Sequence, residues 1–108
     1  MKNSISVKAK LCLLPTSEGG RSNPIFGPGS YRPSHNFGKI GNRFMYIGFI
    51  EISKEFYLKP GECAEVRVDF LKRWPELVKK LTLGRKWYIQ EGAKVVGIAT
   101  VLEILDDI

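Results

Sequence analysis

Few residues of this chain are able to perform catalysis or to hold a metal. His35 is the only histidine, and it follows a proline-rich stretch with no acidic residue close to it in the sequence. A catalytic triad needs a histidine that an acidic side chain holds in place, so we expect His35 to be a surface or loop residue. One histidine and two cysteines also fall short of the usual ligand sets of zinc. We therefore expect no enzyme activity, no metal and no cofactor.

The two cysteines, Cys12 and Cys63, lie far apart in the sequence and form no CxxC motif. They could meet across neighbouring strands. Nothing near the N-terminus resembles a secretory signal, because Lys8 and Lys10 interrupt the only apolar stretch there. We therefore expect a reduced, unreactive pair in a cytoplasmic protein. No apolar run approaches the length of a membrane span, so no membrane contact is expected.

The residues best suited to binding lie in two loops that contain glycine. The candidates are Arg21, Ser22 and Arg32 in the first loop and Glu91, Gly92 and Lys94 in the second. Exposed backbone N–H groups beside arginine or lysine suit a phosphodiester backbone, and Tyr31 and Trp74 could add base stacking. In the alternative interpretation, the arginines cap carbonyl groups within their own loop and the aromatic residues belong to the core. Gly27-Pro28-Gly29 is followed by no GK[ST] sequence, so we expect no nucleotide.

The charge of the chain is compatible with such a surface. Lysine and arginine outnumber aspartate and glutamate by 17 to 11, and the first 43 residues carry seven basic residues against the single acidic residue Glu18. A basic half could meet phosphate or an acidic protein surface. Charge alone is equally compatible with a solvated surface that keeps the protein in solution.

The elements that must position these loops are predicted to be strands. Val7, Ala9 and Leu11 alternate with polar residues, and residues 64–70 show the clearest alternation of the chain. Residues 45–52 are apolar nearly throughout, with Gly48 at a bulge or a close backbone approach. Residues 16–33 contain too many prolines and glycines for a strand ladder and are expected to form an ordered loop.

The C-terminal third is predicted to contain a short helix and a hairpin. Pro75 and Glu76 suit a first helical turn, so we expect a helical turn near residues 75–81. In the hairpin, Trp87 and Ile89 are expected on one face of the first strand and Lys86, Tyr88 and Gln90 on the other. Glu91-Gly92 forms the turn, and the apolar strand after it is expected to be covered on both faces. At 108 residues the chain has room for one domain, residues 1–108. We predict an all-β protein, a small closed barrel or a sandwich.

Five short motifs follow one another along the chain: Glu18-Gly-Gly-Arg21, Pro24 with Phe26, Tyr31-Arg-Pro33, Pro60-Gly61 and Ile89-Gln-Glu-Gly-Ala-Lys-Val-Val-Gly97. In these motifs and in their order, the chain resembles the third, C-terminal domain of elongation factor Tu. The resemblance covers nearly the whole chain and implies a six-stranded antiparallel barrel. In the family, this domain packs on the other domains of the factor and touches the T-stem backbone of aminoacyl-tRNA.

The resemblance implies that Arg21 lies at the tRNA face and that Glu91 and Gly92 lie on the second turn there. Several polar positions differ from the family: Ser22 stands for a histidine, Ser34 for a glutamine, Gln90 for an arginine, and Ala93-Lys94 for Gly-Arg. The loss of several polar contacts weakens an interface. Any binding to tRNA or other RNA is therefore expected to be weak.

Two hypotheses about function follow. In the first, the chain is a non-enzymatic module whose basic loops contact an RNA backbone. In the second, it is an interaction module that docks on a translation GTPase or another protein, or forms a homodimer, through an exposed apolar patch. The residues expected in that patch are Tyr46, Phe56, Tyr57 and Trp74.

Overall fold

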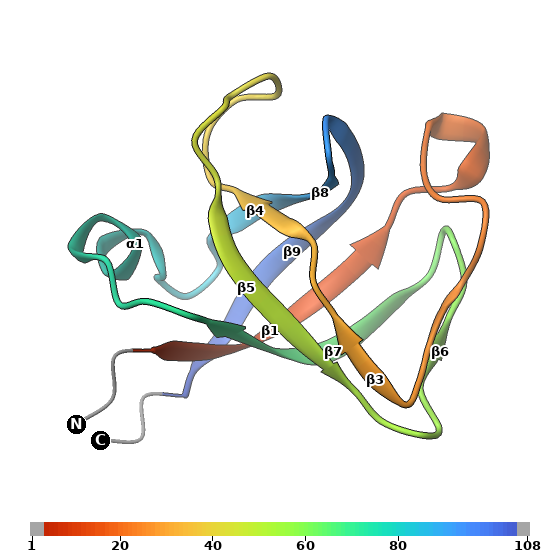
Figure 1. Ribbon diagram of the computed structural model, residues 1–108, viewed down its shortest axis with the longest axis horizontal. Coiled ribbons are helices and arrows are strands. Elements are labelled where there is room, and N and C mark those ends of the chain that lie inside the picture. Colours follow the sequence, from red (N-terminus) through yellow and green to blue (C-terminus); the bar gives the residue numbers. More distant parts are fainter. Residues whose placement is uncertain (1–3, 106–108) are drawn as a thin grey trace.

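The computed structural model describes residues 4–105 and shows a closed antiparallel β-barrel (Figure 1). Six strands form its wall: β1 (Ile5–Leu13), β4 (Ser34–Asn36), β5 (Tyr46–Ile52), β7 (Cys63–Phe70), β8 (Lys86–Glu91) and β9 (Lys94–Ile104). They are neighbours in the order β5-β4-β8-β9-β1-β7, and the pairing of β5 with β7 closes the ring. The predicted all-β class and the six-stranded barrel are confirmed.

The core is the interior of this barrel, and the alternation along its strands fills it. Val7 and Val68 are cross-strand partners on β1 and β7, and both are fully buried. Leu11, Ile50 and Ile89 enter the same interior from three different strands. Because inward and outward side chains alternate in a barrel wall, the polar residues between them are left on the outside.

Strand β9 is central, since it pairs with both β8 and β1. Its inward residues Val96, Ala99 and Val101 are buried, but Ile98 is only half-buried and Leu102 is exposed. The expectation that both faces are covered is therefore wrong. The outer face of a strand in a closed barrel meets solvent unless another element packs over it.

The segment after β1 is ordered, as expected, but it is not free of strands. It contains a 3-10 turn (Thr16–Glu18) and two short strands, β2 (Ile25–Phe26) and β3 (Gly29–Tyr31). Strand β3 pairs with β5, and β2 pairs with β6 (Tyr57–Leu58) in a separate two-stranded ribbon. These ladders fit between the prolines because each is only two or three residues long.

The helix α1 (Pro75–Lys80) lies where the sequence predicts a helical turn. Pro75 occupies a position in its first turn, where the missing N–H is no loss. Leu77 is fully buried and fixes the helix against the barrel. No helix of residues 4–105 is long and apolar enough to cross a membrane.

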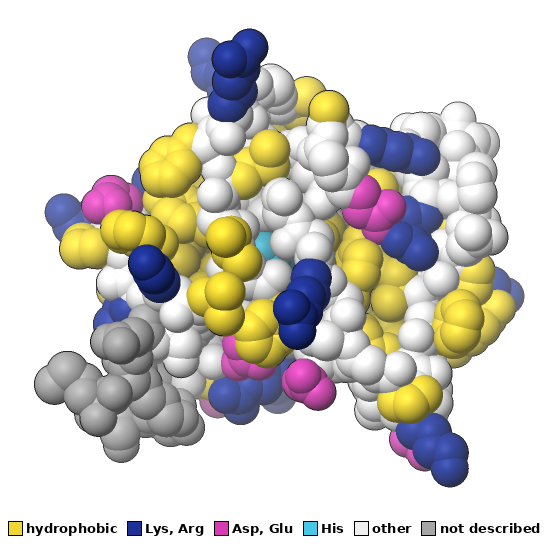
Figure 2. Space-filling view, in the orientation of Figure 1, with side chains coloured by type: hydrophobic (Ala, Val, Ile, Leu, Met, Phe, Trp, Pro, Cys, Tyr) yellow, Lys and Arg dark blue, Asp and Glu magenta, His cyan; other side chains and the backbone are white. Residues whose placement is uncertain are grey.

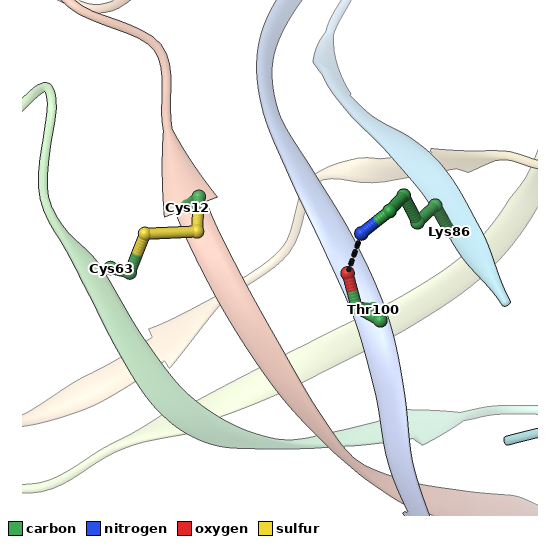
Figure 3. Close-up of a disulfide and its surroundings, with 4 residues drawn as sticks. All are labelled: Cys12, Cys63, Lys86 and Thr100. Carbon is green, nitrogen blue, oxygen red and sulfur yellow. Dashed lines mark hydrogen bonds between the residues drawn. A yellow bond between two sulfur atoms is a disulfide. The ribbon is translucent and has the colours of Figure 1, made fainter. Parts of the chain in front are cut away.

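Cys12 and Cys63 are directly opposite each other on β1 and β7 and are joined by a disulfide bond (Figure 3). The expectation of a reduced pair is wrong for this structure. Cys12 does point away from the core, as predicted, and Cys63 is exposed beside it. The bond links two strands that are 51 residues apart in the sequence but adjacent in the wall.

Candidate binding surface

The structure brings together the two loops that the sequence singles out. Glu91, at the end of β8, forms an ion pair with the guanidinium of Arg21. Tyr31 Oη donates a hydrogen bond to the same carboxylate oxygen, at 2.5 Å. These contacts join residues that are 70 and 60 positions apart in the sequence. Glu91 is therefore the residue that holds the first loop against the second.

The environment of Tyr31 reflects this contact. Burial raises the pKa of its hydroxyl above the ordinary value, and the neighbouring Glu91 carboxylate raises it further because a second negative charge would be repelled. Arg21 acts in the opposite direction but does not reverse the shift. Tyr31 is thus a neutral hydrogen-bond donor, and its aromatic ring supports the guanidinium of Arg21, which lies 5.5 Å from the ring centroid.

Arg21 is only partly available to a partner. Its Nε donates to the backbone oxygen of Asn23 at 3.0 Å, while its Nη1 faces Glu91. The alternative interpretation, in which the arginine caps a carbonyl within its own loop, is therefore correct for one face of this side chain. About a fifth of the side chain remains exposed.

Ser22, Arg32 and Gly92 directly follow the three residues of this contact in the sequence, and all three are exposed, as is Lys94. The guanidinium of Arg32 lies 5.5 Å from the ring centroid of Phe49, which supports it from below. Lys94 is the cross-strand partner of Glu91 in the hairpin. We call Arg21, Ser22, Arg32, Glu91, Gly92 and Lys94 the loop surface. In Figure 2, acidic and basic side chains adjoin one another on the right of the displayed face, where these loops meet.

The hairpin turn differs by one residue from the prediction. Strand β8 includes Glu91, and the turn consists of Gly92 and Ala93. Gly92 has φ = 62°, a conformation that glycine adopts without a steric penalty. Because Glu91 belongs to the strand, its side chain is held in a fixed direction toward Arg21.

Gln90 does not lie on the face opposite Ile89, where simple alternation along the strand places it. The register of β8 against β9 shifts between Ile89 and Gln90, and this turns Gln90 inward, where it is 2% exposed. Its Oε1 accepts a hydrogen bond from Asn36 Nδ2 at 2.7 Å, and its Nε2 donates to the backbone oxygen of Gly92 at 3.2 Å. Gln90 therefore supports the turn from below, a role that no sequence signal indicated.

His35 is fully buried on β4 and is not the surface or loop residue that was expected. Its Nδ1 accepts a hydrogen bond from Trp87 Nε1 at 3.0 Å. Gly48 allows it to fit, since a Cβ there would lie 3.1 Å from His35 Nε2, which confirms the predicted close approach. Burial lowers the pKa of His35 to about 4, so the ring is neutral at physiological pH. Its role in this structure is to fill the core.

The aromatic residues considered for stacking lie in different places. Tyr31 is half-buried and its hydroxyl is engaged, whereas Trp74 belongs to the connection between β7 and α1 and not to either loop. The ammonium of Lys72 lies 5.2 Å from the centroid of a Trp74 ring. Trp74 is therefore not part of the loop surface.

Among residues 4–105, no three histidine, cysteine, aspartate or glutamate side chains are grouped so as to hold a metal ion. Arg21, Pro28, Tyr31 and their neighbours line an open hollow of about 290 Å³ beside the loop surface. No protein-family model matches the chain.

A second surface is apolar, and most of its residues were not anticipated. A cavity of about 220 Å³ is lined by Phe44, Met45, Tyr46, Ile47, Leu71, Lys72 and Trp74, a set that we call the apolar groove. Of the four residues expected in an apolar patch, Trp74 is exposed at the groove, but Tyr46 is 93% buried and Phe56 packs against the core. Tyr57 is exposed elsewhere, beside Phe26 on the β2–β6 ribbon.

Proposed function

We propose that this chain is a non-enzymatic binding module, related in fold to the third domain of elongation factor Tu, whose loop surface contacts an RNA backbone. The observation that carries the proposal is the contact of Arg21 and Tyr31 with Glu91. This contact joins the two loops. The exposed cations Arg32 and Lys94 flank its members, because Arg32 follows Tyr31 in the sequence and Lys94 pairs with Glu91 across the hairpin. Exposed cations and turn N–H groups suit phosphate oxygens.

The expected RNA binding is weak and independent of base sequence. Glu91 places a negative charge between the cations, and Arg21 is partly occupied by it. Contacts to phosphates position a nucleic acid without reading its bases. The cations that remain exposed support about two phosphate contacts, so the logarithm of affinity should fall with the logarithm of salt concentration with a slope of about −1.5.

The proposed compartment is the cytoplasm, where tRNA is available. Disulfide bonds are uncommon there, so the Cys12–Cys63 bond of this structure is evidence against this compartment. Trapping with an alkylating reagent directly from cells tests it: thiols at both positions support the cytoplasm, and a disulfide contradicts it.

Filter binding of unmodified tRNA over a range of salt concentrations tests the proposal. The double variant Arg32→Ala/Lys94→Ala should weaken binding about tenfold or more at low salt and flatten the salt dependence. The matched control, Lys54→Ala/Lys79→Ala, removes the same charge from exposed positions outside the loop surface and should change affinity much less. Absent binding at low salt, or equal losses in both double variants, would refute the proposal.

A second candidate function is protein docking or homodimerisation, without RNA. It is favoured by the apolar groove, where Phe44 and Ile47 expose 64% and 72% of their surface. Contiguous apolar surface of this kind marks interaction sites in soluble proteins. This surface is separate from the loop surface in its residues, so the two candidates can be tested independently.

A further inference from the structure

We propose that the apolar groove binds an acidic segment of a partner protein, through one large apolar side chain that inserts into the cavity and carboxylates that meet the cations around it. This inference concerns a surface that the RNA proposal does not use. Its residues belong to β5 and to the segments that precede β5 and α1. Figure 2 shows hydrophobic side chains gathered over this region, on the left of the displayed face, with basic side chains and an acidic one beside them.

The groove stays exposed although the rest of residues 4–105 is packed around a core. Phe44, Ile47, Leu71 and Trp74 are between 47% and 72% exposed, although each is a large apolar residue. Leu71 N donates to the backbone oxygen of Ile47 at 3.2 Å, which fixes the two walls relative to each other. The groove is therefore a formed surface, and residues 4–105 leave about half or more of each of these four side chains uncovered.

The size of the cavity favours one inserted side chain over a complete small ligand. Its volume is about 220 Å³, whereas sites for small molecules usually measure about 300–1,000 Å³. Interfaces between proteins are often anchored by a single aromatic or aliphatic side chain that fills such a pocket. Phe44 and Tyr46, whose ring centroids are 5.3 Å apart, form one aromatic wall against which this side chain would pack.

The excess of basic over acidic residues around the groove favours an acidic partner. The two segments that form its walls, residues 37–47 and 71–74, contain the four basic residues Lys39, Arg43, Lys72 and Arg73. One acidic residue lies nearby: the pKa of Tyr46 is raised by burial and then by the charge of Glu76. Lys72 lines the cavity itself, above Trp74. A second copy of this chain is less complementary, because its net charge is +6. Complementary charge sets which partner is accepted and how fast it associates.

The proposal is tested by selection of a random peptide library, displayed on phage, against the full-length protein. The expected result is enrichment of peptides that combine net negative charge with an aromatic residue or leucine. Their affinity, measured by fluorescence anisotropy with synthetic copies, should fall about tenfold or more in Ile47→Glu and in Phe44→Glu. Phe26→Glu is the matched control: Phe26 is as exposed as Phe44 but lies on the β2–β6 ribbon, and it should leave affinity unchanged.

Charge reversal at the groove gives a second readout. In Lys72→Glu, the selected acidic peptides should bind more weakly and their binding should become less sensitive to salt, whereas Lys54→Glu should have little effect. The proposal is overturned if no peptide is enriched, if the enriched peptides are neutral or basic, or if binding survives both groove variants. It is also overturned if sedimentation shows a dimer that Ile47→Glu dissociates, since a second copy then fills the groove.

Discussion

At the scale of single residues, Glu91 has the most consequential position in the loop surface. Its carboxylate receives both the Arg21 guanidinium and the Tyr31 hydroxyl, so it assembles the two loops. The same charge repels phosphate. In the proposed function, Glu91 is therefore both the residue that builds the surface and the residue that limits its affinity for RNA.

This dual role leads to a prediction for Glu91→Gln. Glutamine retains an oxygen that accepts hydrogen bonds, but it removes the negative charge and leaves Arg21 freer to meet a phosphate. We expect tRNA to bind several-fold more tightly. The logarithm of affinity should also fall more steeply with the logarithm of salt concentration, by the amount that corresponds to about one additional phosphate contact at most. Filter binding measures both quantities.

The control for this variant is Glu55→Gln, which removes the same charge from an exposed residue in the turn between β5 and β6. It should change affinity only slightly. Weaker binding in Glu91→Gln would contradict the account, because it would mean that the ion pair contributes more to the surface than the freed cation does.

The second prediction at this scale concerns His35, the only histidine of the chain. Burial lowers its pKa from 6.5 to about 4, so the folded protein binds fewer protons than the unfolded chain between these values. Its contribution to stability is complete above pH 6.5 and is lost as pH falls toward 4. We expect urea denaturation to show a free energy of unfolding about 2 kcal/mol lower at pH 5 than at pH 7.

The comparison variant for this prediction is His35→Gln, which keeps an acceptor for Trp87 Nε1 and cannot be charged. It should be less stable than the wild type at pH 7 but should lose most of the pH dependence between pH 7 and pH 5. If the free energy of unfolding of His35→Gln falls between pH 7 and pH 5 as much as that of the wild type, other groups cause the pH dependence.

At the scale of elements, the sequence is most informative where alternation is regular. Val7 to Leu11 on β1 and Val66 to Phe70 on β7 alternate cleanly, and both strands and their inward faces are confirmed. The helix α1 was predicted for a similarly local reason, since proline favours a first turn. These signals depend only on residues that are neighbours in the chain.

Other features depend on pairing between distant residues and could not be predicted in this way. The disulfide requires the register that places Cys12 opposite Cys63, and the burial of His35 requires Gly48 from another strand. Gln90 turns inward because of a register shift that no local pattern indicates. Arg21, Glu91 and Gly92 were named from the loops, but the contribution of Tyr31 as a donor to Glu91 appears only in three dimensions.

The disulfide between β1 and β7 carries the prediction at this scale. A cross-link that spans 51 residues reduces the conformational freedom of the unfolded chain and typically stabilises a protein by about 2–4 kcal/mol. We expect Cys12→Ser/Cys63→Ser to remain folded, because the strands are paired along their length, but to be less stable by this amount. Urea denaturation of the oxidised wild type and the double variant measures the difference.

Treatment of the wild type with a thiol reductant should lower its stability by the same amount. The stability of the double variant should not change under this treatment. If the double variant is as stable as the oxidised wild type, the bond does not contribute to the stability of the barrel. A larger loss, with unfolding at room temperature, would show that the pairing of β1 and β7 depends on it.

At the scale of the whole molecule, two surfaces of different chemistry share one closed barrel. The loop surface is polar and lies where the hairpin β8–β9 meets the segment after β1, whereas the apolar groove lies over β5 and the approach to α1. The closed wall leaves few strand edges for pairing with other chains. Side chains and loops therefore remain as the means by which this barrel can recognise a partner.

The central claim is that the loop surface contacts an RNA backbone. The most direct test is to add tRNA to the isotope-labelled protein and to measure the chemical shifts of its backbone amides by nuclear magnetic resonance, because each amide reports its own surroundings. The account predicts salt-sensitive changes at Arg21, Ser22, Arg32, Gly92 and Lys94, and none at Ile47 or Trp74. It would be contradicted by an unchanged spectrum at low salt, or by changes centred on the apolar groove instead of the loop surface.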